Sequence, residues 1–135
     1  MHDEAREFIR SNSHAVLATF RRDGGVQMSP VDAAVDAEGR VVISSRETAM
    51  KVRNLRRDPR ATLCVLTERF YGDWHYVEGP AELVSLPEAM EGLVDYYRRA
   101  AGEHPDWDDY RAAMVRDRRL LIRIEIQRSG PTVAG

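Results

Sequence analysis

The sequence is poor in cysteine and lysine and contains no long hydrophobic run. Its 135 residues include one cysteine, Cys64, and Lys51 is the only lysine among 20 lysines and arginines. A single cysteine excludes an intrachain disulfide and a zinc site built from several thiolates of this chain. No segment approaches the roughly 18 apolar residues of a membrane span, and the first residues are charged. We therefore expect a cytoplasmic protein without a membrane partner.

A strong basic excess is also missing. The formal net charge is −2, whereas proteins that bind nucleic acid usually carry a marked positive charge. Residues 45–60 nevertheless hold a local net charge of +4, which leaves −6 for the rest of the chain. A small basic patch on an acidic protein suits a compact anion, and a solvated helix face is the alternative. Charge alone leaves both interpretations open.

Motifs for metal binding or covalent catalysis are absent from the sequence. The phosphate-loop pattern Gly-x-x-x-x-Gly-Lys and the nucleophile pattern Gly-x-Ser-x-Gly do not occur. The acidic stretch "EHPDWDDY" resembles a metal site, but Asp106 is well placed to cap the helix that follows. His2, His14 and His75 lack ligand spacing. We expect neither a metal ion nor a covalent intermediate.

The pattern of apolar residues and turns predicts one domain, over residues 1–135, that is mainly β with short helices. Gly-containing turns at "RDGG" and "DAEG" divide residues 14–45 into three strands. Hairpins at this spacing favour an antiparallel barrel, which we expect to have about six strands. Further strands are predicted over 61–68, 73–85 and 118–129, with Gly79-Pro80 marking a bulge or an edge. Helices are predicted over 3–12, 48–57, 87–102 and 104–117, with Pro87 in the first turn of the third.

A polar cluster follows the third predicted strand. The strand "RVVISS" ends in Ser44 and Ser45, and the helix after it carries Thr48, Lys51 and Asn54 in its first turns. Unpaired N–H groups at a helix start, hydroxyls and a lysine can together seat a phosphate. Lys51 and Asn54 are three residues apart and so are expected on one face. The alternative, which the pattern alone favours, is a capping arrangement with Ser45 as the N-cap and Lys51 exposed.

Two other strands carry residues that could face a flat ligand. Gln27, Met28, Ser29 and Pro30 lie on the second predicted strand, where a proline suits an edge or a site at which a ligand meets the backbone. The run "WHY", residues 74–76, alternates between the two faces of another strand. These aromatic side chains could line a ring pocket, or they could belong to the core or to a dimer contact.

Four stretches, "HAVLATFRRDGGVQMSPVDAAVDAEGRVVISS", "KVRNLRRDPRATLCV", "WHYVEGPAEL" and "AGEHPDWDDYRAAMVRDRRLLIRI", occur in this order. They resemble the pyridoxamine 5′-phosphate oxidase-like split β-barrel superfamily. More closely, they resemble its branch of deazaflavin-dependent oxidoreductases that use coenzyme F420. The resemblance covers about residues 8 to 127. It implies a split antiparallel barrel with short flanking helices, and a homodimer with two cofactor sites at the subunit interface.

The resemblance also implies an activity and a set of site residues. The protein would transfer a hydride between coenzyme F420 and an electron-poor, conjugated or heteroaromatic small molecule. Lys51 would hold the cofactor phosphate, Trp74 would help to close the pocket, and His75 or Tyr76 could supply a proton. The cofactor-binding set implied is Gln27, Met28, Ser29, Pro30, Ser44, Ser45, Lys51, Asn54, Arg57 and Trp74.

The basic residues near Lys51 extend this expectation. Arginines such as Arg53, Arg56 and Arg57 could attract the oligoglutamate tail of coenzyme F420. Members of the branch often have a further basic residue just before the lysine, where this chain has "AM", so Arg46 could take that place. Two alternatives remain: an FMN-binding oxidoreductase of the same fold, and a non-catalytic protein that binds coenzyme F420, a flavin or haem.

Overall fold

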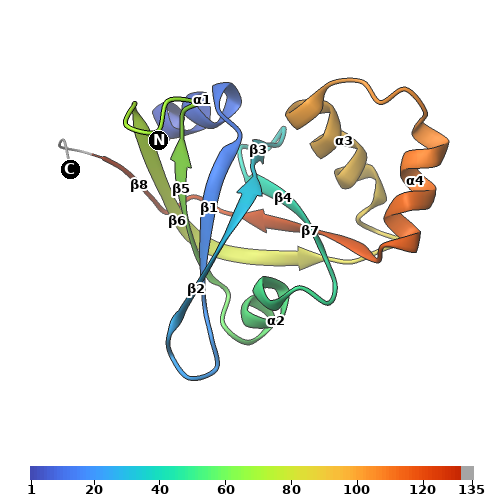
Figure 1. Cartoon of the computed structure of the whole chain (residues 1–135), viewed down its shortest axis with the longest axis horizontal. Coiled ribbons are helices and arrows are strands. Elements are labelled where there is room, and N and C mark those ends of the chain that lie inside the picture. Colours follow the sequence, from blue (N-terminus) through green and yellow to red (C-terminus); the bar gives the residue numbers. More distant parts are fainter. Residues whose placement is uncertain (132–135) are drawn as a thin grey trace.

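The chain folds as an antiparallel sheet that curls into a half-barrel, with helices at its ends and side (Figure 1). The structure is a computed structural model that describes residues 1–131. The elements in chain order are α1 (Asp3–Ser11), β1 (His14–Phe20), β2 (Val26–Asp32), β3 (Ala34–Val35), β4 (Val41–Arg46), α2 (Met50–Arg57), β5 (Arg60–Leu66), β6 (Trp74–Val84), α3 (Met90–Ala101), α4 (Trp107–Arg116), β7 (Arg119–Ile124) and β8 (Arg128–Gly130).

The strand order is β2-β1-β5-β6-β7-β4-β3, with β8 paired to β6, and every pairing is antiparallel. This architecture confirms the predicted mainly β, split antiparallel barrel. The six strands of six or more residues match the predicted number. The second and the last predicted strands are each interrupted, so that β3 (Ala34–Val35) and β8 (Arg128–Gly130) form separate short strands. Among residues 1–131, no helix is long and apolar enough to cross a membrane.

The longest strand, β6, joins the two halves of the sheet. Its first part pairs with β5 as far as Pro80, and its second part pairs with β7 from Ala81 onward. Gly79 lies where the strand crosses over, and a Cβ atom there would stand 1.6 Å from the carbonyl oxygen of Glu125. The Gly79-Pro80 step therefore marks a crossing between half-sheets, neither a bulge nor the edge that the sequence suggested.

The core follows from alternating burial in β1 and β5 and from burial of both faces of β4 and β7. In β1 the residues at every second position are buried, and Leu17 meets Leu63, Val77 and Ile122 in one cluster that α1 and α2 cover with Ile9 and Leu55. A second cluster fixes α3 and α4 against the other face of β4 and β7. This second packing places two helices beside the end of β4, where the polar cluster of the sequence lies (Figure 1).

Two local predictions are wrong. The third predicted helix does not begin at Pro87, because residues 86–89 form a turn and α3 starts at Met90. Ser45 is not the N-cap of α2: it is the penultimate residue of β4, and Ala49 occupies the cap without a side-chain hydrogen bond. The strand continues past the Ser-Ser pair because its partner β7 pairs with it as far as Arg46.

Candidate functional site

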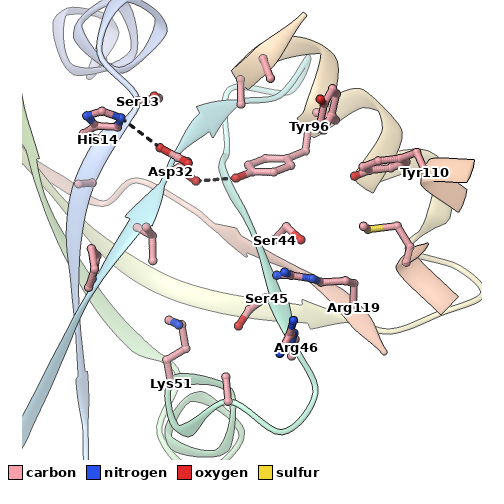
Figure 2. A pocket seen from close by; sticks show the side chains of 18 of the residues that line it. Ser13, His14, Asp32, Ser44, Ser45, Arg46, Lys51, Tyr96, Tyr110 and Arg119 are labelled. Atoms are coloured by element: carbon pink, nitrogen blue, oxygen red, sulfur yellow. Dashed lines mark hydrogen bonds and ion pairs between the residues drawn. The ribbon is translucent and has the colours of Figure 1, made fainter. Parts of the chain in front are cut away.

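An open cavity of about 1040 Å³, called the groove below, lies between the barrel and the α3–α4 pair (Figure 2). Its walls come from the ends of β1, β2, β4 and β7, from the start of α2, and from α3 and α4. The lining residues are Ser13, His14, Ala15, Pro30, Val31, Asp32, Ser44, Ser45, Arg46, Thr48, Ala49, Lys51, Tyr96, Tyr97, Ala100, Ala101, Tyr110, Met114 and Arg119.

One wall of the groove is positively charged. Arg46 and Arg119 are directly opposed across the β4–β7 pair, and Lys51 projects into the same space from the first turn of α2 (Figure 2). Among the residues that the structure describes, none of the three forms an ion pair with a carboxylate. Opposed like charges destabilise a strand pair. Three cations without acidic partners in one cavity are the arrangement expected of an anion site.

The polar atoms of this wall also lack partners. Ser45 Oγ and Arg119 Nε are buried and make no hydrogen bond within residues 1–131. The pKa of Lys51 is lowered, first by burial and then by repulsion from the Arg119 guanidinium. A bound anion would accept hydrogen bonds from these donors, and its negative charge would offset the repulsion between Lys51 and Arg119. The wall is therefore complementary to an anionic group such as a phosphate.

The opposite wall is aromatic. Tyr96 and Tyr97 project from α3, and Tyr110 from α4, with Met114 beside it. The Tyr96 hydroxyl donates to the carbonyl oxygen of Asp32 (2.9 Å), and the Tyr110 hydroxyl donates to that of Leu93 (2.9 Å). Burial raises the pKa of both tyrosines to about 12. These phenols stay neutral at physiological pH. The half-buried rings of Tyr96 and Tyr97 offer a flat apolar surface, and the buried ring of Tyr110 packs behind them.

The mouth of the groove holds a histidine and a carboxylate. His14 and Asp32 are opposed across the β1–β2 pair, and His14 Nε2 lies 3.6 Å from Asp32 Oδ1. Both side chains are more than half exposed. The pair therefore lies where both solvent and a ligand in the groove can reach it.

The structure brings four of the ten residues in the implied cofactor-binding set into the groove: Pro30, Ser44, Ser45 and Lys51. Thr48 of the polar cluster lines it as well. Arg46 lines the groove too. The sequence suggested that this arginine replaces the basic residue that often precedes the lysine in related proteins. On β2 the side chains alternate, so Met28 points to the same outward side as Pro30 and is 67% exposed.

Gln27, Ser29, Asn54 and Arg57 lie elsewhere. Gln27 and Ser29 occupy the less exposed face of β2. Asn54 is buried: it donates to Thr19 Oγ1 (3.1 Å) and Gln27 Oε1 (3.3 Å), and it accepts from Arg57 (3.0 Å). Lys51 and Asn54 were predicted to share one face of the helix. In the structure Lys51 lines the groove, whereas Asn54 lines a second cavity.

The second cavity, of about 490 Å³, lies between α2 and the β1–β2 turn, and it is called the arginine hollow below. It is lined by Arg21, Arg22, Asp23, Met50, Arg53, Asn54 and Arg57. Arg57 also donates to the carbonyl oxygen of Phe20 (2.9 Å). Arg56 points elsewhere and pairs with Glu47.

The aromatic run at the start of β6 lines neither the groove nor the arginine hollow. Trp74, His75 and Tyr76 pair with Leu66, Val65 and Cys64 of β5. The His75 ring packs against Phe8 of α1 with centroids 4.5 Å apart, and its Nδ1 is buried without a partner in the described residues.

The sequence did not reveal Arg119, the tyrosine wall or the His14–Asp32 pair as site residues. Arg119 opens the last long strand, and its place beside Lys51 depends on the β4–β7 register. The tyrosines reach the groove through the packing of α3 and α4 on the sheet. The sequence did contain a group of tyrosines, Tyr96, Tyr97 and Tyr110, that could have indicated an aromatic wall. Core packing accounts for such residues equally well. Among residues 1–131, no group of three or more His, Cys, Asp or Glu side chains could hold a metal ion.

Comparison with known proteins places this geometry in context. The family model described as pyridoxamine 5′-phosphate oxidase matches residues 1–131. A conserved hypothetical protein from Mycobacterium tuberculosis is 26% identical with a TM-score of 0.78, covering 100% of this chain and 92% of that one. A protein described as an F420 reductase is 21% identical with a TM-score of 0.71, covering 93% and 94%. A haem-binding protein from Mycobacterium smegmatis is 22% identical with a TM-score of 0.66, covering 93% and 52%.

Proposed function

The chain belongs to the pyridoxamine 5′-phosphate oxidase family, whose members are oxidoreductases with flavin-type cofactors, and we propose that it is a coenzyme F420-dependent reductase. In this proposal it transfers a hydride between the deazaflavin and an electron-poor, conjugated or heteroaromatic small molecule. The cofactor occupies the groove. The proposal goes beyond the family, because the F420 reductase that the chain resembles is only 21% identical to it.

The observation that carries the proposal is the set of unpartnered donors on the cationic wall. Buried polar atoms without hydrogen bonds are uncommon in folded proteins and often mark a missing ligand. Ser45 Oγ is such an atom, and Lys51, which lines the same cavity, has no acidic partner among the described residues. The residues present therefore fit the phosphate of a ring-plus-phosphate cofactor, held by Lys51 and Ser45, while Ser44 lines the groove from the other face of β4.

The protein's own contribution is to bind, orient and shield. The outward face of β2, with Met28 and Pro30, would support the ring, and the tyrosine wall would exclude water from its other side. When bound, the reduced cofactor supplies the hydride. The proton that completes the reduction is held at His14, whose imidazole lies at the mouth of the groove. His75 and Tyr76, the donors suggested by the sequence, lie outside it.

A second copy of the chain completes the site in this proposal. β2 is an end strand of the sheet, and its outward residues Val26 and Met28 are 49% and 67% exposed. Exposed apolar residues on an edge strand favour pairing with another chain. Because Trp74 lines no part of the groove in one copy, its role in closing the pocket requires the other copy. Light scattering should give twice the 15.4 kDa of one chain. A monomer at all concentrations would contradict the dimer.

The oligoglutamate tail of coenzyme F420 would reach toward the arginine hollow. Arg53 and Arg57 line it together with Arg21 and Arg22, against one acidic residue, Asp23. The surplus of positive charge attracts a chain of carboxylates, and this attraction weakens with salt.

FMN is the second candidate, and the number of cations in the groove favours it. Its phosphate is a monoester, which carries close to two negative charges at pH 7. Arg46, Lys51 and Arg119 could neutralise such a group more completely than the singly charged phosphodiester of coenzyme F420 requires. The ring-plus-phosphate outline is shared, so Lys51 fits either cofactor.

A side-by-side fluorescence titration of the purified protein with coenzyme F420 and with FMN tests the proposal. Tighter binding of coenzyme F420, followed by oxidation of its reduced form when a conjugated acceptor is added, is the expected result. Preference for FMN would move the protein to the flavin-dependent alternative. Binding without turnover by any acceptor would indicate a carrier, and binding of neither cofactor would contradict the groove's assignment.

A further inference from the structure

Arg119 is the charged residue of the groove that has a buried donor without a partner in the described residues. It is the first residue of β7, and its cross-strand partner on β4 is another arginine, Arg46. Its Nε is buried and makes no hydrogen bond within the described residues. A buried guanidinium donor that faces a like charge costs stability, so a fold retains it where a ligand compensates that cost.

The guanidinium lies between the two walls of the groove. Figure 2 shows it extending from β7 into the cavity beside Ser44, with Lys51 on one side and the tyrosines on the other. Its positive charge acts on groups of both walls. It lowers the pKa of Lys51, and it opposes the rise in pKa that burial causes at Tyr96 and Tyr110. Arg119 is therefore placed to contact a molecule that lies against the aromatic wall.

A phosphodiester bound at Lys51 leaves the positive charge of Arg119 without an anionic partner. The phosphate seat at the start of α2 has Lys51 and the Ser45 hydroxyl, and a phosphodiester brings one negative charge, which the charge of Lys51 balances. Arg46 is exposed, so water solvates its charge, whereas the Arg119 donor is buried. The carboxylate that lines the groove, Asp32, sits at the mouth next to His14. Arg119 therefore needs a second anion, separate from the phosphate.

We propose that Arg119 forms a second anion subsite in the groove, which binds the carboxylate of a planar aromatic or conjugated substrate against the tyrosine wall. This inference rests on the proposed function, because it assigns Lys51 to the cofactor.

The chemistry of the two groups defines this substrate class. A guanidinium presents paired donors that match a carboxylate in two parallel hydrogen bonds. The Tyr96 hydroxyl is already engaged with the carbonyl oxygen of Asp32, so this residue offers its ring. Tyr110 is only 6% exposed and supports the wall from behind. Rings favour flat, conjugated partners. Together the groups select an aromatic acid over its neutral analogue.

Calorimetric titration with 2-naphthoate and its neutral analogue 2-naphthamide tests the subsite, using protein saturated with coenzyme F420. In the wild type the acid should bind roughly tenfold to a hundredfold more tightly than the amide, which is the range expected for a charge-assisted hydrogen bond. Arg119→Gln should remove this preference. The matched control Arg116→Gln makes the same charge change on the outer face of α4, where the side chain is 67% exposed, and should retain it.

Folding is checked by thermal melting, and we expect Arg119→Gln to fold because it relieves the Arg46–Arg119 opposition. Arg119→Lys is the second variant: it keeps the charge but loses the paired donors, so it should retain part of the preference.

Three results would contradict the inference in distinguishable ways. Equal binding of acid and amide by the wild type would exclude the subsite while leaving the cofactor assignment intact. The second subsite would also be excluded if Arg119→Gln weakened coenzyme F420 binding as much as Lys51→Gln does. Arg119 would then belong to the phosphate seat. Failure of the wild type to bind coenzyme F420 would instead overturn the proposed function, and with it this inference.

Discussion

Replacing Lys51 with glutamine separates the binding role of this lysine from any structural role. Glutamine keeps a similar length and polarity but removes the charge that the account assigns to phosphate binding. In the structure, burial and the charge of Arg119 both disfavour the protonated form of Lys51, which is why its pKa is lowered. Removing the charge should therefore leave the melting temperature of the unliganded protein unchanged or raised.

The expected loss of cofactor affinity follows from the single contact removed. A hydrogen bond to a charged group contributes about 1.5–3 kcal/mol. Since each 1.4 kcal/mol is a tenfold change in Kd, Lys51→Gln should weaken cofactor binding by roughly tenfold to 150-fold. Ser44, Ser45 and Arg46 remain in the groove, so binding should be weakened and not abolished.

Fluorescence titration of the cofactor and a thermal melt on the same preparations measure both effects. Arg69→Gln is the matched control, because Arg69 is exposed in the β5–β6 loop and lines neither the groove nor the arginine hollow. The control should bind like the wild type. A Lys51→Gln variant that binds normally, or one that loses stability and affinity in parallel, would show that Lys51 does not hold the phosphate.

Three further predictions concern pH and the fold. If protonated Lys51 holds the phosphate, cofactor affinity should be retained below the pKa of Lys51 in the folded protein and lost as the pH rises through that pKa. Because this pKa is lowered, the loss should begin below pH 10.5 in a pH series of titrations, and it should be absent in Lys51→Arg. Gly79→Ala should destabilise the protein by about 3 kcal/mol or more in urea unfolding, since the added Cβ would overlap the carbonyl oxygen of Glu125; unchanged stability would contradict the described crossing of β6. Asn54→Ala should cost roughly 1–3 kcal/mol of stability through its buried amide bonds, with a smaller effect on cofactor affinity than Lys51→Gln, and the reverse order would place Asn54 in the phosphate site.

Much of the fold could be predicted from local pattern. Alternating burial in β1 and β5, glycine turns and the proline after α2 each act over a few residues, and the barrel, the long strands and the four helices follow from them. The superfamily resemblance is confirmed by the family match over residues 1–131. The crossing of β6 at Gly79 could not be predicted, because it depends on which strand pairs with each half.

The candidate site could be predicted in part. The Ser-Ser pair and Lys51 were found because a strand end and a helix start adjoin in sequence. Asn54 shows the limit of helical spacing: two residues three apart are neighbours, yet the long lysine side chain reaches the groove while the short amide turns toward β1. Arg119 joins the site through strand register, which a single sequence does not specify.

A crystal structure of the protein with coenzyme F420 would show directly whether the cofactor occupies the groove. The account predicts the cofactor phosphate in the groove, within hydrogen-bond distance of Lys51 Nζ and the hydroxyl of Ser45, with the ring against the outward face of β2. A phosphate bound in the arginine hollow, or a cofactor that contacts neither Lys51 nor Ser45, would contradict it.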